Sequence, residues 1–167
     1  MSFDDLQFEK NYEQEAMMIW ELIKIAKQGK QVRILGKGNS MRPLLRDGMD
    51  YAFLEDIKDK KTLKKGDVVF YYYNGHFVLH RVYKVLEDGA QMLGDGNNLV
   101  EEMVPWKHIF LKAVKIERNG KVISMNSWYL KCYGTVWMWL RPVRGFIRRG
   151  LRWIKRIMHV KGRSVLL

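Results

Sequence analysis

Three short segments of this chain carry side chains that together could perform serine acyl transfer. Ser40 lies in the run G-N-S-M-R-P, His80 in L-H-R-V and Asp95 in G-D-G-N-N. A serine hydroxyl attacks a carbonyl efficiently only when a neighbouring base takes its proton. Histidine suits that role near neutral pH, and a carboxylate can hold its ring in the required tautomer. The three residues therefore offer a nucleophile, a base and an acid.

Each of the three also has an ordinary structural interpretation. A serine after Gly-Asn and an aspartate between two glycines are typical of tight turns, and a histidine in a strand is commonly a packed residue. The order of triad residues along the chain differs between unrelated folds. The spacing of these three residues therefore does not decide between a catalytic and a structural role. The residues themselves leave both interpretations open.

The segments around these residues resemble, in order and spacing, those of the signal peptidase I and LexA-like serine peptidases. The motif G-x-S-M-x-P-x-L-x-x-G runs from Gly38 to Gly48, and G-D-V-V runs from Gly66 to Val69. H-R-V runs from His80 to Val82, and G-D-x-N runs from Gly94 to Asn97. The resemblance therefore covers roughly residues 30–117.

The H-R-V motif is similar to that of the histidine-base branch, which comprises the endoplasmic-reticulum, archaeal and sporulation-type signal peptidases. By position, the resemblance implies that Ser40 is the nucleophile and His80 the general base. It implies that Asp95 orients His80 or orders the site. It further implies an oxyanion and substrate-binding segment made of Gly38, Asn39, Met41 and Pro43. Backbone N–H groups, including that of Ser40, would hold the oxyanion.

Two of the departures from the family pattern bear on the turn after Ser40 and on the acids of the site. Gly48-Met49-Asp50 stands where the family reads G-D, which predicts an extra residue or a shifted register in that turn. The second aspartate that often follows the G-D-x-N motif is replaced by Glu101 and Glu102. Whether either glutamate stabilises the site stays open at this level.

Residue patterns predict a mostly antiparallel β-structure behind one helix. Apolar residues recur every three or four positions over 3–28, which predicts a helix that packs on the body or, alternatively, docks on a partner. Six strands are expected, at 32–35, 50–54, 68–73, 77–86, 109–117 and 121–125. Alternation places His80 on the same face of its strand as Val78 and Val82. The resemblance implies bent antiparallel sheets of the LexA and signal peptidase type.

The amino-acid composition limits which cofactors and cross-links the chain can carry and shows where its charge lies. The single cysteine, Cys132, excludes an internal disulfide and a cysteine metal cluster, and the four histidines lack metal-ligand spacing, so we expect no metal or cofactor. The net charge is +12, but residues 1–127 hold 20 basic and 18 acidic residues. Residues 128–167 hold ten basic residues and no acid. We therefore expect a catalytic domain over 1–127 and a basic aromatic tail over 128–167.

The tail is typical of a helix that lies on a membrane surface. A helical pattern begins at Arg141, with apolar residues on one face and basic residues on the other. The residues expected to bind an anionic membrane are Arg141, Arg144, Arg148, Arg149, Arg152, Trp153, Lys155 and Arg156. A helix folded back on the domain is the first alternative, and a nucleic-acid contact is the less favoured second.

The chain shows no signal peptide and no run of about 18 apolar residues that would span a bilayer. We therefore expect a peripheral membrane protein on the cytoplasmic face, or else a soluble cytoplasmic one. By the resemblance, it is a serine endopeptidase that cleaves signal or leader peptides, bound as an extended strand, after small residues. The alternatives are a non-catalytic peptide-binding or protein-binding module of the same fold and a LexA-like regulator that binds DNA through its basic tail.

Overall fold

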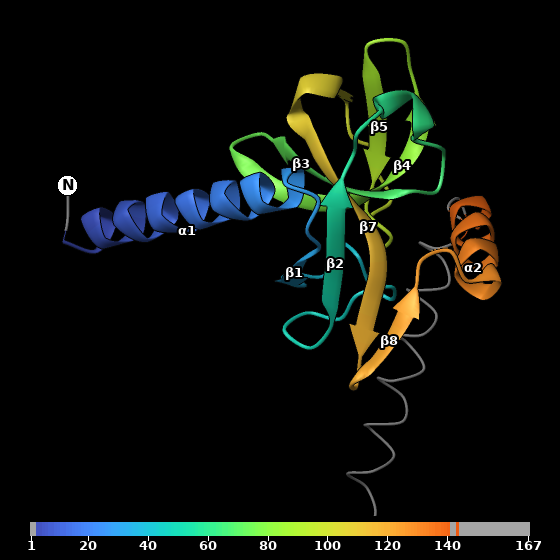
Figure 1. The fold of residues 1–167 in the computed structure, drawn as a ribbon, viewed down its shortest axis with the longest axis horizontal. Helices are drawn as coiled ribbons and strands as arrows, with labels where there is room; N and C mark the ends of the chain where they lie inside the picture. The colour runs from blue at the N-terminus through green and yellow to red at the C-terminus, as the bar shows by residue number, and fades with distance from the viewer. Residues whose placement is uncertain (1–2, 141–142, 144–167) are drawn as a thin grey trace, which may run out of the picture.

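The computed structural model describes residues 3–140 and 143, with the backbone alone for 3–13 (Figure 1). A long helix, α1 (Phe3–Lys27), leads into a bent antiparallel sheet. A second helix, α2 (Trp128–Trp139), follows the sheet and lies on the opposite side of it from α1 in Figure 1. None of the helices in this part of the chain is long and apolar enough to cross a bilayer.

Eight strands form one sheet in the order β1-β2-β7-β3-β4-β5-β6, with β8 paired to β7, and all pairings are antiparallel. Their bounds are β1 Val32–Leu35, β2 Tyr51–Asp56, β3 Val68–Tyr73, β4 His76–Val85, β5 Gly89–Leu93, β6 Met103–Pro105, β7 Ile109–Arg118 and β8 Lys121–Ser124. The expected antiparallel β-class with an N-terminal helix is confirmed.

The sheet has breaks in register and packs a separate apolar core on each face. Register shifts occur in β2, β3 and β4, and such bulges increase local twist. Alternation along β3 sends Val68 and Phe70 into the core beneath α1. It sends Val69 and Tyr71 into the second core, near β5 and β6. Strand β3 therefore belongs to both cores, and its second face carries part of the candidate site.

Two expected hairpin turns are present, and their backbone explains their sequences. Asn74 and Gly75 have φ of 48° and 83°, and Asn119 and Gly120 have φ of 50° and 74°. Positive φ at both central positions matches the right-handed twist of the flanking strands and favours Asn-Gly. Strands β5 and β6 were not predicted, because one begins Gly-Ala-Gln and the other has three residues ending in proline.

The two helices differ in how well sequence predicted them. Helix α1 is confirmed: it is followed by Gly29 at φ 87°, and its Ile23 and Ala26 are buried on the sheet. Helix α2 was not predicted, because its aromatic and β-branched residues and Gly134 have weak helix propensity. The described C-terminal helix is thus aromatic rather than basic. The helix expected from Arg141 lies outside the described residues.

Candidate active site

His80 is buried on β4, where two side chains contact the same ring nitrogen. Its Nδ1 lies 2.6 Å from Glu101 Oε1 and 2.8 Å from the hydroxyl oxygen of Tyr71. The Tyr71 hydroxyl also hydrogen-bonds to the other carboxylate oxygen of Glu101. The position facing His80 across the β3–β4 pairing is Val69, so Tyr71, two residues along β3, projects from the same face.

These contacts determine which nitrogen of His80 carries the proton. The single hydroxyl proton of Tyr71 is donated to Glu101, so the tyrosine oxygen can only accept from the ring. Glu101, as a carboxylate, is also an acceptor. A proton on Nδ1 can be donated to the acceptor oxygens of Glu101 and Tyr71. An unprotonated Nδ1 would instead place its lone pair against the lone pairs of both oxygens. With its one proton on Nδ1, the ring carries its free lone pair on Nε2, which is the arrangement that a general base requires.

The electrostatics of the two partners support this assignment. Burial alone would raise the pKa of Glu101, but the hydrogen bond and charge of His80 and the bond from Tyr71 lower it overall. Glu101 is therefore ionised at neutral pH. Burial, followed by the hydrogen bond to Glu101 and the negative charge of that carboxylate, raises the pKa of Tyr71 far above its ordinary value. Tyr71 thus stays a neutral hydrogen-bond donor.

The other ring nitrogen of His80 makes no hydrogen bond. Nε2 is the one buried side-chain nitrogen or oxygen in the described chain that has no hydrogen-bond partner. An unpaired buried polar atom is costly in a stable fold and calls for an explanation. The expected bond from Ser40 Oγ to this nitrogen is not formed here. Catalytic hydrogen bonds often tighten only when substrate is bound.

Ser40 is half-buried, and the Gly-Asp-Gly turn after β5 holds its backbone. The N–H of Gly96 donates to the carbonyl oxygen of Ser40 over 2.6 Å. A Cβ on Gly94 would lie 2.6 Å from that oxygen, and a Cβ on Gly96 would lie 2.3 Å from the carbonyl oxygen of Asn39. Only glycine fits at either position. The two segments that resemble family motifs are therefore in direct backbone contact.

The structure places Asp95 in a buried ion pair with Arg81. Its two carboxylate oxygens accept from Arg81 Nε at 2.8 Å and Nη2 at 2.7 Å, and both residues are 2% exposed. Arg81 follows His80 on β4 and so points to the other side of the strand. Of the two roles expected for Asp95, these contacts fit ordering of the site, whereas Glu101 is the carboxylate on His80.

Tyr71 and Glu101 are the site residues that sequence reasoning did not assign. The alternation that grouped Val78, His80 and Val82 applies equally to β3, and its register with β4 would have placed Tyr71 on the face of His80. Glu101 lies in an irregular segment after β5, for which no periodicity exists. The signal for Glu101 was only the missing second aspartate of the family pattern.

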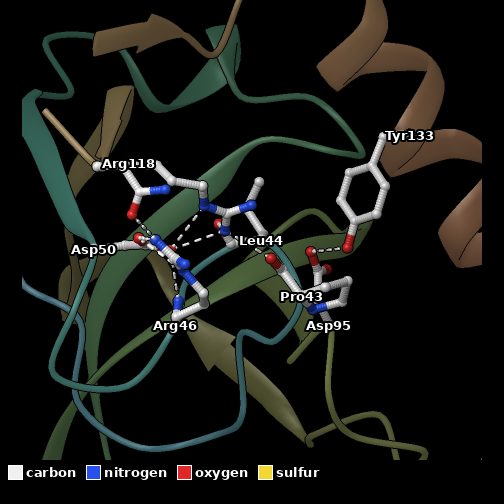
Figure 2. Close-up of polar contacts among 8 residues, drawn as sticks. Pro43, Leu44, Arg46, Asp50, Asp95, Arg118 and Tyr133 are labelled. Atoms are coloured by element: carbon white, nitrogen blue, oxygen red, sulfur yellow. Dashed lines mark hydrogen bonds and ion pairs between the residues drawn. The ribbon is translucent and has the colours of Figure 1, made fainter. Parts of the chain in front are cut away.

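A cluster of charges holds the segment that follows Ser40 (Figure 2). Asp50 is fully buried and accepts from Arg46 Nη2 at 2.7 Å and from Arg118 Nη2 at 2.8 Å. Arg118 also donates to the carbonyl oxygens of Pro43 and Leu44, both at 2.9 Å. Burial would raise the pKa of Asp50, but these hydrogen bonds lower it to about 2. Strand β7 thereby fixes the turn after the serine.

The expected irregularity at positions 48–50 explains how Asp50 reaches this cluster. Gly48 adopts φ of 66°, and its N–H donates to the carbonyl oxygen of Gly36 over 2.8 Å. Met49 projects into solvent at 58% exposure. The turn therefore closes on the strand before Ser40 and returns Asp50 to the interior.

An apolar cavity of about 350 Å³ borders Ser40. Gly38, Ser40 and Met41 form one wall, and residues of α1, β1, β3 and β4 form most of the others. Asn39 and Pro43 are exposed and contribute backbone contacts, to Gly96 and Arg118 respectively. The expected substrate-binding segment thus divides into a part that lines the cavity and a part that anchors the loop.

The residues expected to bind membrane, Arg141 to Arg156, lie outside the described part of the chain. Immediately before them, α2 turns one side to solvent. Trp128 and Trp139 are 77% and 79% exposed, and Tyr129 and Val136 are also exposed. Exposed tryptophan at this density is unusual for a solvated helix, since isolated apolar residues are common but grouped aromatic ones mark contact surfaces.

The structure holds an oriented imidazole on β4, a serine on a braced turn and, beside that serine, an apolar cavity that His80 does not line. The carboxylate of Glu101 stabilises the imidazolium that proton uptake would create. These are the parts needed for acyl transfer from a peptide carbonyl. No model of a known protein family matches this chain, and no curated protein matches it.

Proposed function

We propose that the protein is a serine endopeptidase similar to the histidine-base signal peptidases, with Ser40, His80 and Glu101 as its catalytic residues. The observation that carries the proposal is the environment of His80. Its Nδ1 is held by Glu101 and Tyr71, and its buried Nε2 has no partner. A packed structural histidine would have both nitrogens satisfied, so the orphan nitrogen favours a base that awaits a proton.

The reaction proceeds in two stages. The Ser40 Oγ–H proton passes to His80 Nε2 while Oγ bonds to the peptide carbonyl carbon, and the resulting oxyanion is held by backbone N–H groups of the serine turn. The imidazolium then gives its proton to the leaving amine as the C–N bond breaks. Water attacks the acyl-enzyme with His80 again as base, which releases the acid and regenerates Ser40.

The cavity and the sheet edge suggest how a peptide would bind. Strand β1 is at the end of the sheet order, and it lines the cavity together with Ser40. An extended peptide can add to such an edge through main-chain hydrogen bonds, with alternate side chains entering pockets. The apolar lining favours uncharged residues before the cut. Signal or leader peptides, with small residues there, are the substrates that the resemblance suggests.

We further propose that the enzyme works at a membrane surface, with the cytoplasmic face as the expected side. The exposed tryptophans of α2 belong to the tail over 128–167, whose ten basic residues are unopposed by any acid. Aromatic and basic side chains together favour the interface of an anionic bilayer.

Peptide cleavage tests the proposal. The full chain is incubated with a peptide library that carries small residues at the cut site, with and without anionic vesicles, and products are identified by mass spectrometry. Ser40→Ala and His80→Ala should abolish cleavage. His76→Ala, on the same strand but exposed, is the matched control and should cleave like the wild type.

Two results would reject the peptidase. One is cleavage that survives Ser40→Ala, and the other is a folded wild type that cleaves no peptide under either condition. In the second case, retention of library peptides by the inactive protein would favour the non-catalytic peptide-binding module. Binding of duplex DNA that strengthens as salt is lowered would instead favour the LexA-like regulator.

A further inference from the structure

Helix α2 contacts the candidate site through one side only. Tyr133 donates its hydroxyl to Asp95 Oδ2 over 3.2 Å (Figure 2). Trp137 donates its indole N–H to the main-chain carbonyl oxygen of Asp95 over 2.7 Å. Gly134, between them, is buried against the guanidinium of Arg81. At 3.6 residues per turn, these three positions share one face of the helix.

Asp95 links this helix to both reacting residues. Through its carboxylate it pairs with Arg81, the residue after His80 on β4. Through the next residue, Gly96, its turn hydrogen-bonds to the carbonyl of Ser40. A shift of Asp95 would therefore move the nucleophile and the strand of the base relative to each other.

The packing leaves little freedom for such a shift. Arg81 Nη1 donates to the carbonyl of Gly66 over 2.8 Å, and a Cβ on Gly134 would lie 2.8 Å from the same nitrogen. The absence of a side chain at Gly134 is what lets α2 approach the ion pair. A buried, hydrogen-bonded pair of this kind is rigid once its partners are satisfied.

We propose that α2 is part of the catalytic unit: Tyr133, Gly134 and Trp137 are positioning residues that set the distance between Ser40 and His80 through Asp95. This inference rests on the proposed serine peptidase function. Residues 128–139, which form α2, were expected to belong to a tail separate from the catalytic domain, whereas these contacts make the helix a support of the site. Its outer face remains available for the membrane.

The test measures how fast Ser40 reacts and how many sites react. The full chain is treated with a serine-directed fluorophosphonate, and labelling of Ser40 is followed by mass spectrometry. The labelling rate reports the reactivity of the nucleophile, and the final labelled fraction counts folded sites. Kinetics with a cleaved peptide supply kcat and KM in parallel. The variants are Tyr133→Phe, Trp137→Phe and Gly134→Ala, with Val136→Ala on the outer, exposed face as control.

We expect Trp137→Phe and Gly134→Ala to slow labelling and lower kcat by roughly 5- to 50-fold, since small misplacements of reacting groups are that costly. KM and the final labelled fraction should stay near wild type, because the cavity lies on other elements. Tyr133→Phe should give a smaller effect, and Val136→Ala none. Wild-type labelling rates in both Trp137→Phe and Gly134→Ala would overturn the inference. A reduced labelled fraction at an unchanged rate would overturn it too, because it would mean only lost stability.

Failure of the proposed peptidase function can be distinguished from failure of the positioning role of α2. If the folded wild type is neither labelled nor active, the peptidase proposal fails, and the positioning role is read from amide NMR shifts. Displaced Ser40 and Gly96 resonances in Trp137→Phe, with unchanged ones in Val136→Ala, would support it. Unchanged Ser40 and Gly96 resonances in Trp137→Phe would overturn it.

Discussion

At the scale of single residues, the informative feature is the asymmetry of His80. One ring nitrogen is held by Glu101 and Tyr71, and the other is buried without a partner. The carboxylate and the tyrosine proton together impose the Nδ1–H tautomer, so the ring is oriented without a hydrogen bond from Ser40. This division between an orienting side and a reacting side is what catalysis by a serine–histidine pair requires.

Glu101→Gln should lower cleavage by about 10²- to 10⁴-fold, because an amide can present its N–H₂ to Nδ1 and favour the unreactive tautomer. Steady-state kinetics check this, with the effect expected in kcat. Glu102→Gln, one residue away and exposed, is the control and should retain full activity. Equal activity of both variants would remove Glu101 from the catalytic set.

At the scale of elements, the serine turn is held from two directions. The Gly-Asp-Gly turn after β5 supports the Ser40 carbonyl, and Arg118 of β7 binds the carbonyls of Pro43 and Leu44. Neither support belongs to the serine segment itself. Ser40 is therefore positioned by tertiary contacts with segments that come much later in the chain.

Gly96→Ala should impair catalysis more than its loss of stability explains. The added Cβ would lie 2.3 Å from the carbonyl oxygen of Asn39, which must move together with Ser40. Gly120→Ala is the contrast: its φ of 74° strains an alanine by about 1 kcal/mol, but its Cβ meets open space. Unfolding by urea and cleavage assays should show a stability defect in both variants and an activity defect only in Gly96→Ala.

Asp50→Asn should destabilise the fold on the order of 3 kcal/mol at neutral pH, since it unpairs the charges of Arg46 and Arg118. The pKa of Asp50 is about 2 in the fold and 3.8 ordinarily. The contribution of Asp50 to the free energy of unfolding is therefore complete above pH 3.8 and is lost as the pH falls through 2. The difference in the free energy of unfolding between wild type and variant, measured with urea, should shrink from pH 7 to pH 3. A gap that widens in acid would contradict this account.

Asp88→Asn, whose side chain is exposed, provides the matched control for that comparison. It should unfold like the wild type at both pH values. A similar loss in this variant would mean that overall charge, rather than the buried cluster, governs acid stability.

At the scale of the whole molecule, the basic excess and four of the six tryptophans lie at one end of the chain. Residues 1–127 are nearly neutral, and the tail carries the basic excess. Helix α2 joins the two: its inner face contacts Asp95, and its outer face exposes Trp128 and Trp139. The surface proposed for the membrane is thus continuous with an element that touches the site.

The full chain should bind vesicles that contain anionic lipid and bind neutral vesicles much less. Co-sedimentation measures this, and added salt should weaken binding because the attraction between basic residues and the surface is screened. Replacing Trp128 and Trp139 together by alanine should reduce binding further at any salt concentration. Equal binding to neutral and anionic vesicles would argue against a role for the basic tail.

The sequence by itself determined the parts that depend on local pattern. Alternation and Asn-Gly turns located the hairpins β3–β4 and β7–β8, and helical periodicity located α1. The same alternation placed His80 on an apolar face. The motif order singled out Ser40 and His80 as the residues to examine. These features follow from backbone periodicity and turn chemistry, which act over a few residues.

Only the tertiary structure decided how the carboxylates are used. Asp95 had the motif that suggested an acid for His80, yet it pairs with Arg81, and Glu101 from an irregular segment contacts His80. Strand register and the path of that segment bring these groups together, and neither leaves a periodic signal. The docking of α2 likewise depends on a glycine that fits over Arg81. Contacts between residues far apart in the chain are set by packing, which no local pattern encodes.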